Sequence, residues 1–269
     1  MKISIITICY NNEKDIRATI ESVVGQTYPE IEYIIKDGGS KDSTLAIAEE
    51  YQEKYGNVEG KFRGGFKVIS CKDKGIYDAL NKGVRMARGE WIHVLGCDDW
   101  ICDPAALGEI VKAAEGSGAE IVVTPAEKDG GGRTINLKSC LYSIPYCHQG
   151  VLMKKSLIER LGGFDDTLRL AGDYDLTLRA HLSGAKEIVV PKTFAHYTTG
   201  GASSDWGKLA RETIEVARRR FGLSEKESEK FGRTRCLPLR ILLPLLFHRR
   251  GMVRKGAVWQ LVRVMANLV

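Results

Sequence analysis

Short apolar runs recur along the first half of the chain, and segments with helical periodicity lie between them. The first run, Ile3–Ile8, has the composition of a buried strand. Regular alternation of strand and helix predicts an α/β fold, in which a mostly parallel sheet is flanked by helices. The expected strands are Ile3–Ile8, Ile31–Ile35, Phe66–Cys71, Trp91–Leu95 and Glu120–Thr124.

Apolar residues at helical spacing predict helices after the first, third and fourth of these strands. We expect the first helix to begin at Asn12 as its N-cap, and the third at Asp103, followed by Pro104. The second should end before Gly89, a candidate left-handed residue just past the helix. The expected inward faces are Ile16, Ile20, Val23 and Val24; Ile76, Leu80, Val84 and Ala87; and Leu107, Ile110, Val111 and Ala114.

Charge is divided unevenly along the chain. Residues 1–206 carry 25 Lys and Arg against 29 Asp and Glu, whereas residues 207–269 carry 15 against 5. The net charge of +6 is therefore a property of the tail. We place a domain boundary at this point, with an α/β domain over 1–206 and a basic, amphipathic helical tail over 207–269.

The tail combines these cations with aliphatic side chains and Trp259. This combination favours a helix lying in the plane of an anionic membrane surface. The alternative is a helix pair packed on the rest of the chain or on another subunit of a homo-oligomer. No nucleic acid partner is expected, because the cations alternate with aliphatic residues and not with aromatics that stack on bases.

Two further observations concern the cellular setting. The seven cysteines are scattered without a C-x-x-C pair, which argues against a zinc site and suits a reducing compartment. No basic and apolar leader precedes Ile3, and the longest apolar run, Ile241–Phe247, is shorter than the roughly twenty residues that span a bilayer. We expect a cytoplasmic protein, peripheral on the cytoplasmic face of the inner membrane.

Carboxylates follow three of the first four predicted strands, at the end of a sheet where ligands collect in open α/β folds. Asp37 follows the second strand and Asp73 the third, whereas Asp98 and Asp99 together follow the fourth. A single acid there can also cap a helix. Two adjacent acids repel each other unless a cation or a strong hydrogen-bond donor offsets them, and their hard oxygen ligands suit Mg²⁺ or Mn²⁺ bridging a diphosphate.

An ordered series of motifs over most of residues 1–203 resembles the family-two nucleotide-sugar glycosyltransferases of GT-A fold, particularly the subgroup that builds bacterial surface polysaccharides. No single motif would be specific, but their order is. The motifs are Tyr10-Asn11-Asn12, residues 37–44, residues 73–83, Gly89-Glu90-Trp91, Asp98-Asp99, His148-Gln149, residues 162–165, Gly172-Asp173-Tyr174-Asp175 with Arg179, and residues 200–203.

The resemblance implies a nucleotide site and a metal site. Asp37 is expected at the base, which favours uridine, and Asp98 beside the ribose. Asp99 is expected to ligate the divalent cation. The family's motif is usually D-x-D, but this chain has Gly at 96 and Cys at 97, so only one carboxylate ligand is assured. His196 is a second metal ligand, a phosphate donor or a structural residue. The remaining candidates for nucleotide binding are Tyr10, Asn12, Lys74 and Asp78. Alternatively, Lys74 forms a solvated charge pair with Asp73, and Asp78 only lies on the exposed face of a helix.

The resemblance also implies a catalytic base, because a sugar hydroxyl is a poor nucleophile until its proton is removed. Asp173 stands at the family's base position, and Asp175 is expected to cap the helix or pair with Arg179. His148 and Gln149 are expected to line the acceptor or sugar pocket, or else to be buried hydrogen-bonding residues.

The reaction expected from this family is an inverting transfer of one hexosyl or N-acetylhexosaminyl unit, from a UDP-sugar in particular, to a lipid-linked or oligosaccharide acceptor. The sequence lacks the Gln-x-x-Arg-Trp motif of processive synthases. A nucleotidyltransferase and a non-catalytic, membrane-associated nucleotide-binding module are the alternatives. The first of these is disfavoured because no basic glycine-rich loop follows the first strand.

Overall fold

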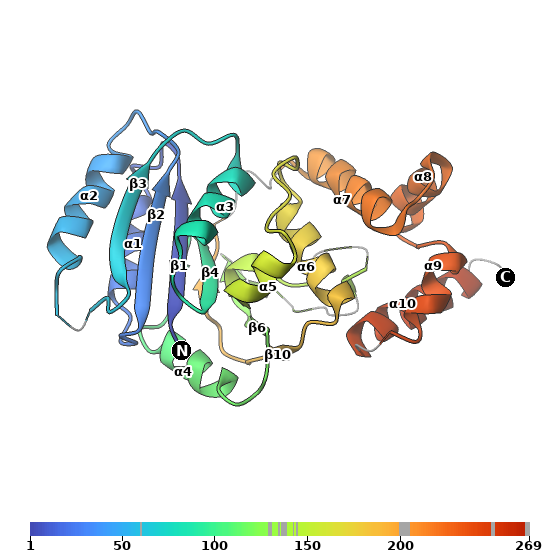
Figure 1. Cartoon of the computed structure of the whole chain (residues 1–269). Coiled ribbons are helices and arrows are strands. Elements are labelled where there is room, and N and C mark those ends of the chain that lie inside the picture. Colours follow the sequence, from blue (N-terminus) through green and yellow to red (C-terminus); the bar gives the residue numbers. More distant parts are fainter. Residues whose placement is uncertain are drawn as a thin grey trace.

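The structure, a computed structural model, describes residues 1–59, 61–128, 131–133, 135, 139–141, 143, 145–198, 205–248 and 251–266. Its main sheet has seven strands in the order β10-β6-β9-β4-β1-β2-β3 (Figure 1). The strands are β1 Ile3–Cys9, β2 Ile31–Asp37, β3 Gly65–Ser70, β4 Trp91–Gly96, β6 Ile121–Val123, β9 Val151–Lys154 and β10 Glu187–Val189.

The expectation of a mostly parallel α/β sheet is confirmed. β1 pairs in parallel with both β2 and β4, and β2 pairs in parallel with β3. Ile3, Ile5 and Ile6 of β1 are fully buried, because helices cover both faces of the sheet. The sequence did not predict β9, which runs antiparallel to β4 and β6 and separates them.

Six helices accompany the sheet in the described residues before residue 199: α1 Ile16–Val24, α2 Thr44–Tyr55, α3 Ile76–Met86, α4 Ala106–Ala114, α5 Lys155–Arg160 and α6 Gly172–Ser183. The expected inward faces of α1 and α4 are buried. On α3, Leu80 and Val84 are buried as expected. The prediction that Ile76 faces inward is wrong, since this residue lies in the first turn and is 38% exposed.

Three predicted helix ends need correction. α1 begins at Ile16, because the backbone from Asn12 first makes a turn in which Asn12 O accepts from Asp15 N. α4 begins at Ala106, because the Asp103 carboxylate caps Ala105 N in a preceding turn. Gly89 is not left-handed; it is required because a Cβ there would lie 2.5 Å from Ser4 N.

A second, small sheet has the order β5-β11-β7-β8. Its strands are β5 Trp100–Ile101, β11 Ala195–His196, β7 Ala126–Lys128 and β8 Gly131–Arg133. β7 and β8 pair antiparallel. Residues 129 and 130, between them, lie outside the described residues. This sheet brings β11 beside the segment that directly follows β4.

The C-terminal part of the chain is helical, with α7 Trp206–Phe221, α8 Glu225–Thr234, α9 Leu239–Leu245 and α10 Gly251–Ala266. α7 packs against α6, and Val216 and Leu242 of the tail belong to the same buried apolar cluster as Leu178 of α6. This packing corresponds to the alternative of helices docked on the rest of the chain. The domain boundary at residue 206 stays a prediction. Within the described ranges, none of the helices has the length and hydropathy needed to cross a bilayer.

Candidate active site

Two loops meet beyond the ends of β1 and β2. Asn11 N donates to Ser40 Oγ at 2.8 Å, and Asn12 N donates to Thr44 Oγ1 at 2.7 Å. Tyr10 is left 56% exposed beside Gly38, where a Cβ would stand 3.4 Å from the Tyr10 ring. The loops therefore present a free aromatic face next to the turn that begins at Asp37.

Asp37 is fully buried and organises this turn. Its carboxylate accepts from Gly39 N at 2.9 Å, from Ser40 N and Oγ, and from Ser70 Oγ. Desolvation opposes ionisation, but the hydroxyl and amide hydrogen bonds from Ser40, Ser70 and Gly39 outweigh it, so the pKa of Asp37 is lowered. Gly39 supplies the left-handed conformation at φ +87°. A direct contact of Asp37 with a base stays a prediction.

A charged network that sequence reasoning missed lies between the ends of β2 and β3. Lys36 Nζ is completely buried and donates to Asp37 O, Cys71 O and Asp73 Oδ2 at 2.6 to 2.7 Å. Lys82 Nζ contacts the other oxygen of Asp73 at 2.7 Å. No local signal identifies these partners, because a lysine at the end of an apolar run resembles an exposed strand terminus.

Lys74 and Asp78 belong to the adjoining loop and helix start. Lys74 N donates to Asp78 Oδ2 at 2.9 Å, and Lys82 Nζ lies 2.9 Å from the same carboxylate. The Lys74 backbone N–H and then the Lys82 ammonium hold the pKa of Asp78 below its usual value. Asp78, in the first turn of α3, thus binds back to the loop that precedes the helix, and the exposed Lys74 side chain is the group of this pair that is directed to solvent.

The pair Asp98-Asp99 directly follows β4. Asp99 is 2% exposed; its Oδ2 accepts from Gln149 Nε2 at 2.7 Å and its Oδ1 from Thr198 N at 2.9 Å. Gly96 makes room for it, because a Cβ at this position would stand 2.3 Å from Asp99 Oδ2. The absence of a side chain at position 96 therefore has a steric reason.

The two acids are suited to a divalent cation. Desolvation, and then the negative charge of Asp99, raise the pKa of the half-buried Asp98. In the described part of the chain no group of three or more His, Cys, Asp or Glu side chains is arranged to hold a metal. Mg²⁺ and Mn²⁺ bind through one or two carboxylates together with phosphate oxygens and water, and that arrangement fits a pair of acids.

His196, the other predicted metal ligand, lies on β11 opposite Trp100 of β5. Its imidazole is largely buried and stacks on the indole ring, with the ring centroids 3.9 Å apart and the planes at 7°. Two residues further on, Thr198 binds Asp99 through its backbone. His196 therefore supports the strand that reaches Asp99, and its role as a metal ligand stays a prediction. Residues 200–203 lie outside the described residues.

Asp173, the predicted base, lies in the first turn of α6. Its Oδ1 accepts from Tyr174 N at 2.8 Å and lies 3.4 Å from Tyr77 Oη, and its Oδ2 lies 3.5 Å from His148 Nδ1. Burial, and then the Asp173 charge, raise the pKa of Tyr77 well above 10, so that its hydroxyl stays protonated and donates. Gly172 permits this contact, because a Cβ there would stand 2.7 Å from the Tyr77 ring.

His148 and Gln149 bring the two acids into one site. They begin a 3₁₀ turn, η2 His148–Gly150, which leads into β9. His148 faces Asp173, and Gln149, which also accepts from Cys147 Sγ, directs its amide NH₂ at Asp99. We refer to Asp98, Asp99, His148, Gln149 and Asp173 as the acidic site.

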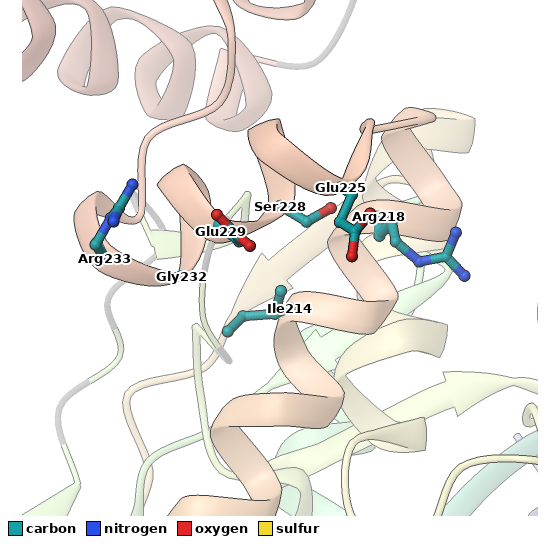
Figure 2. A pocket seen from close by; sticks show the side chains of 7 residues that line it. All are labelled: Ile214, Arg218, Glu225, Ser228, Glu229, Gly232 and Arg233. Atoms are coloured by element: carbon teal, nitrogen blue, oxygen red, sulfur yellow. The ribbon is translucent and has the colours of Figure 1, made fainter.

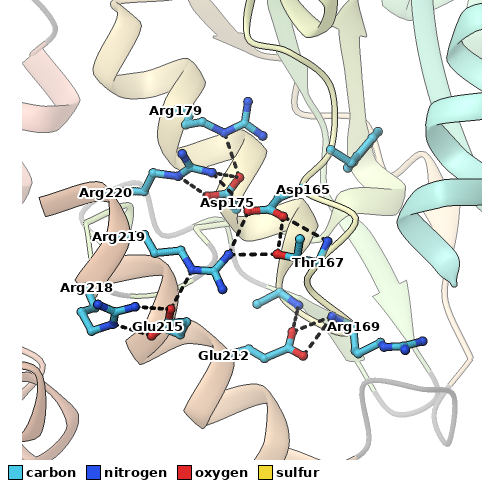
Figure 3. Close-up of polar contacts among 12 residues, drawn as sticks. Asp165, Thr167, Arg169, Asp175, Arg179, Glu212, Glu215, Arg218, Arg219 and Arg220 are labelled. Atoms are coloured by element: carbon cyan, nitrogen blue, oxygen red, sulfur yellow. Dashed lines mark hydrogen bonds and ion pairs between the residues drawn. The ribbon is translucent and has the colours of Figure 1, made fainter. Parts of the chain in front are cut away.

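Asp175 is separate from this site. It is 1% exposed and pairs with Arg179 Nε at 2.8 Å, which confirms the expected pairing, and it also binds Arg220 of α7 (Figure 3).

A cavity of about 800 Å³ lies between α7 and α8, away from the acidic site (Figure 2). Its lining contains none of the predicted site residues: it consists of Ile214, Arg218, Glu225, Ser228, Glu229, Gly232 and Arg233.

Comparison with known sequences gives a consistent result. The family model described as glycosyl transferase family 2 matches residues 4–162. A PGL/p-HBAD biosynthesis glycosyltransferase of Mycobacterium bovis is 27% identical over 181 residues, which cover 65% of this chain and 68% of that protein. The putative glycosyltransferase EpsH of Bacillus subtilis is 35% identical over 136 residues, which cover 50% of this chain and 37% of EpsH.

Solved structures share the fold over nearly the whole chain. Residues 1–349 of S. aureus TarS in complex with UDP-GlcNAc superpose with a TM-score of 0.68 at 19% identity, covering 99% of this chain and 92% of that one. The mannosyltransferase PcManGT of Pyrobaculum calidifontis, in complex with GDP-Man and Mn²⁺, gives 0.66 at 16% identity, covering 98% and 75%.

Proposed function

The chain belongs to glycosyltransferase family 2, and we propose that this glycosyltransferase moves a single sugar from a nucleotide-sugar donor to a saccharide or lipid-linked acceptor with inversion at the anomeric carbon. One observation carries the proposal. The consecutive residues His148 and Gln149 contact Asp173 and Asp99, so a candidate base and a candidate metal ligand share one site.

We propose that Asp99, with Asp98 beside it, holds Mn²⁺ or Mg²⁺ together with the donor's phosphates. When bound, the cation would neutralise negative charge on the leaving nucleoside diphosphate. The chain's own contribution is to fix the Asp99 carboxylate between Gln149 Nε2 and Thr198 N. Such outer hydrogen bonds orient a ligating carboxylate before the metal arrives. The Mn²⁺ present with GDP-Man in the PcManGT structure supports this assignment.

Asp173 is the proposed general base. Its Oδ2 is directed at His148, whose imidazole is partly exposed, and the acceptor hydroxyl would approach from that side. Tyr77 Oη and Tyr174 N hold the other oxygen and keep the carboxylate oriented. The carboxylate takes the hydroxyl proton as the acceptor oxygen bonds to the anomeric carbon and the diphosphate departs from the opposite face. A single displacement of this kind inverts the configuration.

For the donor we propose a UDP-sugar. The support is a resemblance to TarS, whose structures include complexes with UDP and UDP-GlcNAc. In this chain Tyr10 offers a free ring for stacking on a base next to the Asp37 turn, and Asn12 belongs to the same pair of loops. Lys74 is proposed to contact a phosphate. GDP-mannose, the ligand of PcManGT, is the other donor to test.

The acceptor is proposed to be carried at a membrane surface, in the synthesis of a surface polysaccharide or glycolipid. Apolar side chains are exposed on α9 and α10 and just after α9: Leu243, Val258 and Val262 are each half exposed or more, and Phe247, which follows α9, is 87% exposed. Lys255 and Arg254 are exposed on α10. Apolar side chains interspersed with cations suit peripheral binding to anionic lipid on the cytoplasmic face of the inner membrane. A homo-oligomer stays a prediction.

The test is a thermal-shift screen of UDP- and GDP-sugars with and without Mn²⁺. A cognate donor should raise the unfolding temperature by mass action, and Mn²⁺ should increase that rise. Asp99→Asn should remove the Mn²⁺ effect, and Asp173→Asn should retain donor binding while losing transfer. The proposal is wrong if no nucleotide-sugar binds or is turned over, or if a nucleoside triphosphate and a sugar phosphate are the substrates.

A further inference from the structure

A carboxylate of α7 holds the backbone that leads into α6. Glu212 Oε2 accepts from Leu170 N at 2.7 Å and from Ala171 N at 2.9 Å, and Oε1 accepts from Arg169 N at 2.9 Å (Figure 3). Ala171, the N-cap of α6, has no side-chain acceptor of its own for these donors. The N–H of Ala171 is at the helix start, where unpaired N–H groups carry partial positive charge that a carboxylate stabilises, and those of Arg169 and Leu170 lie in the backbone before it.

Two arginines of the same helix hold residues on both sides of Asp173 in the sequence. Arg220 binds Asp175 through Nε and Nη2 at 2.5 and 2.9 Å. Arg219 Nη1 lies 2.9 Å from Thr167 Oγ1 and 3.2 Å from Asp165 Oδ2. The Asp175 carboxylate is almost completely buried, so losing a partner there leaves a poorly compensated charge.

These contacts come from one face of α7. Glu212, Val216 and Arg220 are spaced four residues apart, which aligns them along a helix. Val216 and Ala217 are fully buried, and α7 packs directly on α6. The polar contacts to residues 165–175 therefore rest on an apolar interface that fixes the two helices against each other.

The same segment reaches the nucleotide side of the site. Arg169, whose N–H binds Glu212, donates through Nη1 to Lys74 O at 3.0 Å. Lys74 lies in the loop after β3 that adjoins Asp73 and Asp78. The backbone that Glu212 holds is thus connected at one end to Asp173 and at the other to the loop proposed for donor binding.

We propose that Glu212 and Arg220 of α7 are positioning residues for the transfer step, holding the first turn of α6 so that Asp173 faces His148. The inference rests on the proposed role of Asp173 as the base. It assigns the C-terminal helices a part in setting the rate of transfer, in addition to any part in attachment to a membrane. Donor binding should change little, because Arg169 reaches Lys74 O through its guanidinium, whereas Glu212 binds only the backbone N–H of Arg169.

The experiment compares Glu212→Gln with Glu215→Gln in the full chain. Both replace one carboxylate of α7 by an amide, but Glu215 pairs with Arg218 and Arg219 of its own helix. Three quantities are measured: hydrogen exchange of the amides of residues 169–173, the donor Kd by calorimetry, and kcat. The donor is the one that the wild-type chain turns over, sought first among UDP-GlcNAc and GDP-mannose.

For Glu212→Gln we expect amide exchange at 169–173 to rise about tenfold or more and kcat to fall by about tenfold, with the donor Kd within about twofold of wild type. Glu215→Gln should change none of the three. Arg220→Met should lower kcat in the same way, and Arg220→Lys should recover part of the loss.

The inference is overturned if exchange rises at 169–173 while kcat is unchanged, or if kcat and donor affinity fall together. It is also overturned if Glu215→Gln matches Glu212→Gln. Should the wild-type chain turn over no nucleotide-sugar, the proposed function fails first, and the exchange measurement alone then decides whether Glu212 holds the start of α6.

Discussion

Gln149 Nε2 lies 2.7 Å from Asp99 Oδ2, and both side chains are buried. The two residues are fifty positions apart in the sequence, yet this bond joins the end of β4 to the turn that precedes β9. Since His148 faces Asp173, one short turn relates the proposed metal ligand to the proposed base. The geometry makes Gln149 the residue whose replacement should most directly disturb Asp99.

We expect Gln149→Leu to weaken metal-dependent activity. The substitution removes a donor to Asp99 Oδ2, so the carboxylate loses one of the two bonds that orient it. Loss of such an outer hydrogen bond typically costs roughly 10- to 100-fold in metal affinity or activity. A Mn²⁺ titration of transfer measures the effect. The control is Gln26→Leu, because Gln26 is also buried but binds Ser22 O and Asp103 O; an equal shift in both variants would contradict the assignment.

Gly96→Ala should displace Asp99 without adding charge or bulk elsewhere. The new Cβ would stand 2.3 Å from Asp99 Oδ2, closer than any van der Waals contact allows. We expect the Mn²⁺ requirement of transfer to rise and the unfolding temperature to fall. Gly108→Ala is the matched control, since nothing lies within 4 Å of its Cβ and it lies inside α4. That variant should gain about 1 kcal/mol of stability and keep full activity.

The fold could be predicted from the sequence where a pattern is local. The apolar runs of β1 to β4 identify buried parallel strands, and the motif series identifies the family. β9 was missed because Val151–Lys154 is four residues long and pairs antiparallel with strands far away in the chain. Gly89 was misread because its requirement comes from Ser4 on a neighbouring strand and not from its own helix.

The site shows the same division. Asp98, Asp99 and Asp173 stand in motifs and could be named in advance. The bond from Gln149 to Asp99, the buried ammonium of Lys36 on Asp73 and the carboxylate of Glu212 on α6 are contacts between distant segments. Such contacts follow from the packing of the sheet and helices, which no spacing along the chain encodes.

Stability should depend on pH through His93 of β4. Burial, only partly offset by a hydrogen bond to Val151 O, lowers the pKa of His93 to about 4. The unfolded chain takes up the proton near pH 6.5 and the folded chain only near pH 4. The free energy of unfolding therefore falls as the pH drops from 6.5 to 4, by about 3 kcal/mol from this group. Denaturant unfolding of wild type and His93→Gln measures it, and equal pH slopes would refute it.

The exposed apolar side chains of α9, of α10 and of Phe247, which follows α9, allow a direct test of membrane attachment. Phe247 is 87% exposed, and burying such a ring in the interface contributes about 1.5 to 3 kcal/mol. Phe247→Ser should therefore weaken binding of the full chain to vesicles containing phosphatidylglycerol by about tenfold or more, while Val58→Ser, at an exposed apolar site far along the chain, should leave it unchanged. Co-sedimentation at rising salt measures both, because screening should weaken the contribution of Lys255 and Arg254. If Phe247→Ser sediments as the wild type does and salt has no effect, the attachment proposal is wrong.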